Sequence, residues 1–143
     1  MWYLFPAHDT LVGRFSDEPV IVAADSDNNT IWKVNVRGQE KVLLASSPGP
    51  QAVLALPRHG VLLWSSKNDS NIMQLHLQGE GSAAELVSGV NDAVALGYVE
   101  AEDLLVWVTY GSRTLESSKR DGSQRKTIRS LDFTPSDLVV VGR

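Results

Sequence analysis

Two stretches of sequence decide the fold: VIVAADSDNNTIWKVNVRG at residues 20–38 and VLLWSSKNDSNIMQLHLQG at residues 61–79. The second falls on the first without a gap when the chain is shifted by 41 residues. A further shift of 43 residues places residues 61–79 on LLVWVTYGSRTLESSKRDG at residues 104–122, where Trp64 meets Trp107. The chain therefore contains one sequence unit three times, which predicts three similar structural units in a row.

A period of this length is typical of four-stranded propeller blades, but helical repeats such as HEAT have a similar period. The strand signal decides between them. The apolar runs are short, rich in Val, Ile, Leu and Trp, and bounded by Gly, Pro, Asn, Asp and Ser. Residues 31–36 and 72–77 alternate with a period of two, as half-buried strands do. We therefore expect an all-β chain of three four-stranded propeller blades.

The repeat also predicts the boundaries of the blades. We expect a single partial propeller over residues 1–143, with blades at about 10–46, 52–88 and 93–130. The first strand of each blade is expected at 10–15, 52–57 and 93–99, and it would line the central channel. LVVV at residues 138–141 predicts one more first strand, at 135–142, and residues 1–5 predict a separate strand before the first blade.

Composition excludes several classes of function. The net charge is -4 and the sequence has no cysteine, so there is no basic nucleic-acid footprint, disulfide or thiolate metal site. The basic cluster between residues 119 and 129 is interrupted by Asp121, Gly122 and Ser123, and we expect a solvated surface there. No apolar run reaches the roughly 18 residues of a membrane span. The apolar start is too short for a signal peptide, so we recognise none.

No residue pattern predicts catalysis, a metal or a cofactor. DSDNN at residues 25–29 resembles the start of a calcium loop, but Thr30 and Val36 stand where an EF-hand needs Gly and Glu. We read it as a polar turn. No histidine lies at a metal-binding spacing from another ligand, and structural or solvated roles are expected for all three: His8, His59 and His76.

The aromatic residues divide into core and surface candidates. Trp64 and Trp107 lie inside apolar strands at equivalent positions, which predicts packing between blades. Trp32 aligns with Met73 and Glu116, so we expect it on an exposed or interface face. An aromatic patch near the start of the chain is a candidate intersubunit anchor, formed by Trp2, Tyr3 and Phe5.

The repeats resemble a known family. LWSS at residues 63–66, VWVT at 106–109 and KRDG at 119–122 are similar to the YWTD repeats of the low-density lipoprotein receptor class B family, in which aromatic-Trp-Thr-Asp precedes a hydrophobic-Asp-Gly turn. The resemblance covers Thr10 to Gly142. VAAD at residues 22–25 keeps the acid without the Trp, while the other two units keep the Trp and lose the Asp. Residues 22–31 also resemble an NHL repeat, a related propeller unit.

The resemblance implies a six-bladed propeller, of which the three blades of this chain are half, and an extracellular or cell-surface location. Three blades leave two end faces uncovered, and exposed apolar faces mark interaction sites. Three ways of covering them remain open: a second copy forming a homodimer that closes six blades, another chain, or the remainder of a longer propeller. In the first case, residues 138–141 and 1–5 would complete each other's sheets across the joint.

The resemblance also implies a non-enzymatic, protein-binding module. Ligands would dock where the second-to-third-strand turns and the links between blades meet, and the positions that fall there are Lys67, Asn91, Asp92, Tyr110, Arg113 and Phe133. Asn28 and Asn68 begin glycosylation sequons in the same turns, where glycans would obstruct a ligand. The alternatives are a self-assembling structural component and a propeller lactonase or hydrolase with a channel metal. The first strands AVLA at 52–55 and AVAL at 93–96 supply few ligands for such a metal.

Overall fold

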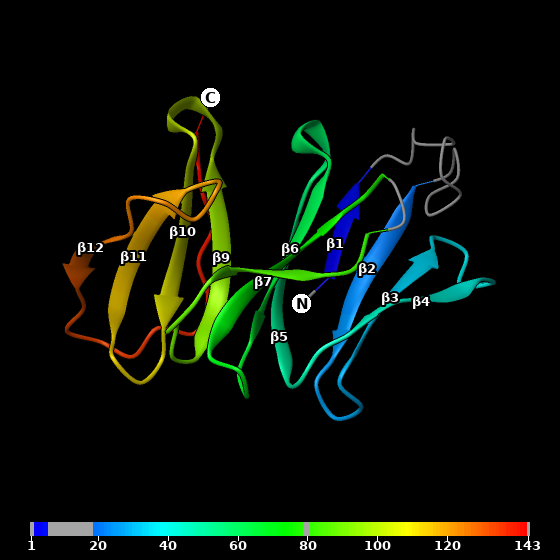
Figure 1. The fold of residues 1–143 in the computed structure, drawn as a ribbon, viewed down its shortest axis with the longest axis horizontal. Helices are drawn as coiled ribbons and strands as arrows, with labels where there is room; N and C mark the ends of the chain where they lie inside the picture. Colours follow the sequence, from blue (N-terminus) through cyan, green and yellow to red (C-terminus); the bar gives the residue numbers. More distant parts are fainter. Residues whose placement is uncertain (1, 6–18, 79–80, 143) are drawn as a thin grey trace.

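The chain forms three antiparallel four-stranded sheets that stand side by side (Figure 1). The computed structural model describes residues 2–5, 19–78 and 81–142, with the backbone alone for residues 2–5. The strands are β1 (Trp2–Phe5), β2 (Val20–Asp25), β3 (Thr30–Asn35), β4 (Lys41–Ser46), β5 (Pro50–Leu56), β6 (Val61–Ser66), β7 (Asn71–His76), β8 (Ala84–Val87), β9 (Ala93–Val99), β10 (Leu104–Thr109), β11 (Thr114–Lys119) and β12 (Lys126–Ser130).

The strands follow one another within each sheet, in the orders β1-β2-β3-β4, β5-β6-β7-β8 and β9-β10-β11-β12. Each sheet is thus one sequence unit, as a blade is. Short 3-10 turns, η1 (Pro57–His59) and η2 (Glu100–Glu102), connect β5 to β6 and β9 to β10. The prediction of an all-β chain of three four-stranded blades is confirmed. Neither short helical turn in the described part of the chain is long and apolar enough to cross a membrane.

The first sheet begins earlier than the sequence predicted. Residues 1–5 were expected to form a strand separate from the first blade, but β1 pairs with β2 and completes that sheet, with Trp2 opposite Ala23. The same register occurs in the other two sheets, where Val53 lies opposite Trp64 and Leu96 opposite Trp107. Aromatic and aliphatic residues favour strands, which suits WYLF to this position. The first strand predicted at 10–15 lies outside the described residues.

The strand predicted at residues 135–142 is wrong. In the described part of this segment, up to residue 142, the backbone pairs with none of the described strands, so it is not part of a sheet. The segment nevertheless runs along β9 (Figure 1). A Cβ at Gly97 would lie 2.6 Å from Leu138 Cδ1 and 2.8 Å from Val140 Cγ2, so these two side chains fill the space above the glycine.

The core lies between the sheets. Val20, Val22 and Ile31 of the first sheet pack against residues of the second that include Val53 and Trp64. The second core joins the opposite face of the second sheet to the third, and it contains Ala52, Leu56, Val61, Leu63, Ile72, Val87, Val90, Ala93, Leu96, Leu105 and Trp107. Every residue of β6 is buried, because both of its faces are covered. Burial of Trp64 and Trp107 confirms that both pack between blades.

Candidate binding surface

Main-chain hydrogen bonds order one end of the molecule, the lower end in Figure 1. Each sheet's last strand is followed by a link whose backbone N–H donates to the turn between that sheet's second and third strands. The three equivalent bonds are Ser47 N to Asn29 O at 2.9 Å, Val90 N to Ser70 O at 2.7 Å and Leu131 N to Arg113 O at 2.7 Å. All three accepting residues have positive φ, which aims their carbonyls at the links.

The links are bonded on their other side as well. Lys67 N donates to Gly49 O at 2.8 Å, and Tyr110 N donates to Asp92 O at 2.9 Å. Each of these bonds joins a link to the turn of the following sheet. Turns and links therefore alternate in one hydrogen-bonded array across the three sheets, and we call the end of the molecule that carries it the turn face.

The structure places all six predicted ligand-binding residues on the turn face. Asp92 and Tyr110 meet through their main-chain bond, and Arg113 belongs to the same turn as Tyr110. Lys67 lies in the preceding turn, Asn91 lies beside Asp92, and Phe133 follows the link that is bonded to Arg113. The side chains of Tyr110 and Phe133 are large and apolar, yet these residues are 53% and 57% exposed. Exposed aromatic side chains on a fixed backbone are typical anchors of protein interfaces.

Two buried acceptors without partners lie at the same end. Asp92 Oδ1 and Gln51 Oε1 are both shielded from solvent and receive no hydrogen bond. Gln51 lies near the start of β5 and lines a hollow of about 230 Å³ together with Ser26, Lys67 and Asn68. Because an unpaired buried acceptor is costly, a donor supplied by a bound molecule would be favoured here.

Both predicted glycosylation sites are exposed turn residues on this face. Asn28 Nδ2 donates to Asp25 Oδ2 at 2.8 Å, and its hydrogen bonds hold the pKa of Asp25 below the ordinary value. The Asn68 side chain lies against Gly49, where an added Cβ would come within 3.1 Å of its Cγ. Among the described residues, no cluster of three His, Asp or Glu side chains could hold a metal ion.

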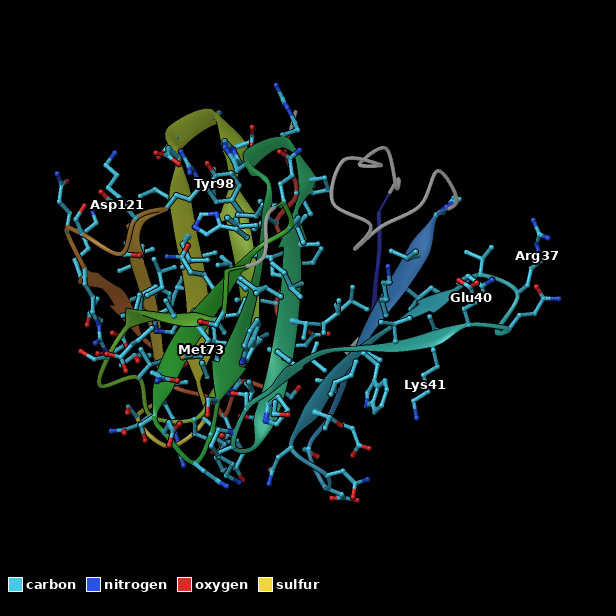
Figure 2. The ribbon with its side chains drawn as sticks, turned by 45° about the vertical axis from the view of Figure 1, so that its right-hand side comes forward. Arg37, Glu40, Lys41, Met73, Tyr98 and Asp121 are labelled. Atoms are coloured by element: carbon cyan, nitrogen blue, oxygen red, sulfur yellow. The ribbon has the colours of Figure 1, made fainter. Side chains whose placement is uncertain are left out.

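Sequence reasoning missed a polar chain at the opposite end. Tyr98 OH donates to Asp103 Oδ1 at 2.5 Å, and Arg120 Nε donates to the same oxygen at 3.2 Å. His59 Nε2 lies 3.3 Å from both Tyr98 OH and Glu100 Oε2. Burial, and then the bond to Asp103, raises the pKa of Tyr98, while the bond from Tyr98 lowers the pKa of Asp103. Figure 2 shows Tyr98 near this end of its strand.

This series of polar contacts joins the second sheet to the third. It lies beside an apolar cavity of about 400 Å³, lined by Leu54, Leu56, Leu96, Tyr98 and Val140 among others. His59 therefore connects two blades, a structural role of the kind expected. Its partner Glu100 is 41 positions away in the next unit, so no local spacing in the sequence signals the contact.

The fold and the turn face define the class: a unit of three β-propeller blades that displays an ordered array of loops. Among solved structures, the chain is similar to one in a nidogen/laminin complex, with a TM-score of 0.76 and 22% identity over 86% of this chain and 48% of that chain. It is also similar to the hydrazine synthase of Kuenenia stuttgartiensis, with a TM-score of 0.70 and 11% identity over 82% of this chain and 34% of that one.

A Bacteroides thetaiotaomicron protein of unknown function gives a TM-score of 0.62 and 10% identity over 96% of this chain and 36% of that one. At these identities the likeness shows the fold alone. The chain spans about half or less of the length of each of these structures. No family model and no curated protein matches the sequence.

Proposed function

We propose that the chain is a non-enzymatic, protein-binding propeller module of the YWTD type, acting outside the cell or at its surface. The observation that carries this proposal is the turn face, where main-chain bonds fix the loops and leave Tyr110 and Phe133 exposed. The nidogen/laminin neighbour, a propeller in a protein complex, supports the same kind of activity. Lys67 and Arg113 add positive charge around the aromatic residues, so the partner surface is expected to combine apolar and acidic groups.

The experiment measures binding to immobilised laminin, one of the two proteins named in the complex that contains the structural neighbour. Tyr110→Ala and Phe133→Ala should each weaken binding by about tenfold or more, because each removes an exposed aromatic anchor. Ile128→Ala is the matched control, since Ile128 is an exposed apolar residue on β12, outside the turns and links. Affinity that both aromatic variants leave unchanged would place the interface elsewhere, and the absence of any binding would reject a laminin-type partner.

Ring completion is part of this proposal: the exposed end faces are covered by a second copy, by another chain or by the rest of a longer propeller. A self-assembling structural component is the second candidate, and it is favoured by the apolar residues left exposed on the first sheet, such as Leu43. The mass of the particle in solution and laminin binding together separate the two candidates, because a component built for assembly alone is oligomeric at micromolar concentration and binds no other protein. A lactonase or hydrolase would instead require a divalent metal bound in the channel, detectable by calorimetric titration.

A further inference from the structure

β1 and residues 138–141 both lie where the first strand of a sheet is expected. β1 occupies the first position of the first sheet, in the register that β5 and β9 use in theirs. Its connection to β2 spans residues 6–19, whereas the equivalent connections at residues 57–60 and 100–103 are short turns. More residues therefore separate β1 from β2 than separate β5 from β6 or β9 from β10.

The segment at residues 138–141 lies at the corresponding position after the third sheet. The link before it is bonded to the Arg113 turn in the way that Val90 is bonded to Ser70, and β9 follows Val90 as a first strand. Leu138 and Val140 fill the space above Gly97, whereas Val139 and Val141 are 82% and 88% exposed. This alternation is that of a strand with one face packed and the other uncovered. The segment is therefore placed as the first strand of a further sheet, and no other strand of that sheet lies among the described residues.

The outer face of the first sheet, which faces away from the second sheet, is apolar and exposed, as Val139 and Val141 are. Val20, Val22 and Ile31 point toward the second sheet, so Ile21 and Trp32 lie on the opposite face by strand alternation. Leu43 pairs with Trp32 on that face and is 48% exposed. Lys41 Nζ lies 4.2 Å from the centroid of the Trp32 ring. Figure 2 shows Lys41 on the outlying sheet, away from the other two.

We propose that two copies of this chain close one six-sheet ring by exchanging a strand: residues 138–141 of each copy replace β1 at the edge of β2 in the other. This inference rests on the ring completion in the proposed function and names the second copy as the occupant. A two-fold axis makes both junctions identical, since each copy donates one strand and receives one. The chain covers 48% of the nidogen-type neighbour, so two copies account for a structure of about that size.

The exchange gains apolar burial with little change in strand pairing. Displacing β1 breaks four residue pairs with β2, and the incoming segment of residues 138–141 restores a strand of the same length. Val139 and Val141 then enter the core between the first and second sheets of the other copy, and the outer face of each first sheet meets the third sheet of the other. A strand added to a sheet edge draws its affinity from such main-chain bonds and its specificity from alternate side chains.

The test measures the mass of the full chain by sedimentation at micromolar concentration. The wild type should have twice the monomer mass of 15.6 kDa. Val139→Asp combined with Val141→Asp should give folded monomers that still melt cooperatively, at a temperature below that of the wild-type dimer. These side chains are exposed in the single chain and buried in the dimer. Ile128→Asp, at an exposed apolar site on β12, should remain dimeric. A monomeric wild type, or a dimer that survives the Val139 and Val141 changes, overturns the proposal.

A second variant separates exchange from simple stacking of two complete units. Tyr3→Pro combined with Leu4→Pro weakens β1, because proline removes backbone donors from a strand. Exchange predicts a dimer that dissociates about tenfold less readily, since β1 competes with the incoming strand. An unchanged or weaker dimer rules out exchange. Laminin binding is measured on the wild type in parallel. A monomeric wild type that binds laminin rejects this inference alone, and a wild-type dimer that binds no laminin rejects the laminin-type partner alone.

Discussion

Two tryptophans at equivalent positions differ in how their indole N–H is satisfied. Trp64 Nε1 donates to Ser47 Oγ at 2.9 Å inside the core. Trp107 Nε1 is equally buried and has no hydrogen-bond partner. Val90 stands where Ser47 stands in the previous link, since both residues donate a backbone hydrogen bond to the second-to-third-strand turn of the preceding sheet. The third sheet thus retains the cost of one unpaired donor, which the second sheet avoids.

Val90→Thr should place a hydroxyl acceptor beside Trp107 Nε1 with almost no change in volume. A buried Val→Thr change ordinarily costs about 1–3 kcal/mol of unfolding free energy, because a hydroxyl is buried. At residue 90 the new bond should offset most of that cost, so we expect a change within about 0.5 kcal/mol of zero. Val53→Thr, at another fully buried valine, is the control and should show the full loss. Equal losses in urea unfolding would contradict this assignment.

At this scale the sequence predicted burial but not its polar partners. The apolar neighbours of Trp64 and Trp107 indicated their place between blades, and burial confirms it. The hydroxyl that meets Trp64 lies 17 residues earlier, in the link from another sheet. Such contacts depend on how sheets stack, which strand alternation does not specify.

At the scale of elements, Asp103 joins three parts of the third sheet. It ends the β9–β10 turn with φ 52°, accepts a hydrogen bond from Tyr98 of β9 and another from Arg120 after β11. The bond from Tyr98, the strongest influence, holds the pKa of Asp103 below its ordinary value. Because the folded pKa lies below the unfolded one, this carboxylate stabilises the fold above the unfolded pKa, and the contribution is lost as pH falls through the folded pKa.

Asp103→Asn should therefore make the acid side of the stability profile shallower. Asn tolerates the left-handed backbone at this position, so the turn itself is retained. The melting temperature should fall at neutral pH and converge with that of the wild type as the pH falls below the ordinary aspartate pKa of about 4. Asp132→Asn changes the formal charge equally at an exposed residue and serves as the control. An Asp103→Asn curve parallel to the wild type in thermal melts from neutral to acid pH would refute the assignment.

Most elements could be predicted from the repeat, and the two ends of the chain could not. Strands inside the three units have neighbours of similar sequence, so their alternation and turns reinforce one another. The repeat predicts the first strand of the first blade at residues 10–15, so it leaves residues 1–5 outside that blade. The segment at 138–141 has strand-like residues but pairs with no strand in the described part of the chain. Pairing is a property of two segments, and a sequence pattern describes only one of them.

For the whole molecule, the second sheet contributes to both hydrophobic cores. Val53 and Trp64 belong to the core shared with the first sheet, and Leu63 to the core shared with the third. The outer sheets each have one face packed on the second. The three units should therefore unfold together, because loss of the second sheet removes the packing of both neighbours.

Leu63→Ala should lower the free energy of unfolding by about 2–5 kcal/mol, the usual cost of truncating a fully buried leucine. Ile128→Ala, at a residue 47% exposed on β12, is the matched control and should cost less than about 1 kcal/mol. Tryptophan fluorescence and circular dichroism, followed together through urea unfolding, should report one transition at the same midpoint. Separate midpoints for the two probes would show that the sheets unfold independently.

The main-chain bonds across the turn face have a consequence for protein engineering. Loop positions there are fixed by amide and carbonyl groups that every residue except proline supplies. Substituting the exposed side chains at 67, 110 and 133 thus leaves the bonds that place the loops intact. This end of the molecule is suited to randomised libraries, from which new recognition specificities can be selected on an unchanged scaffold.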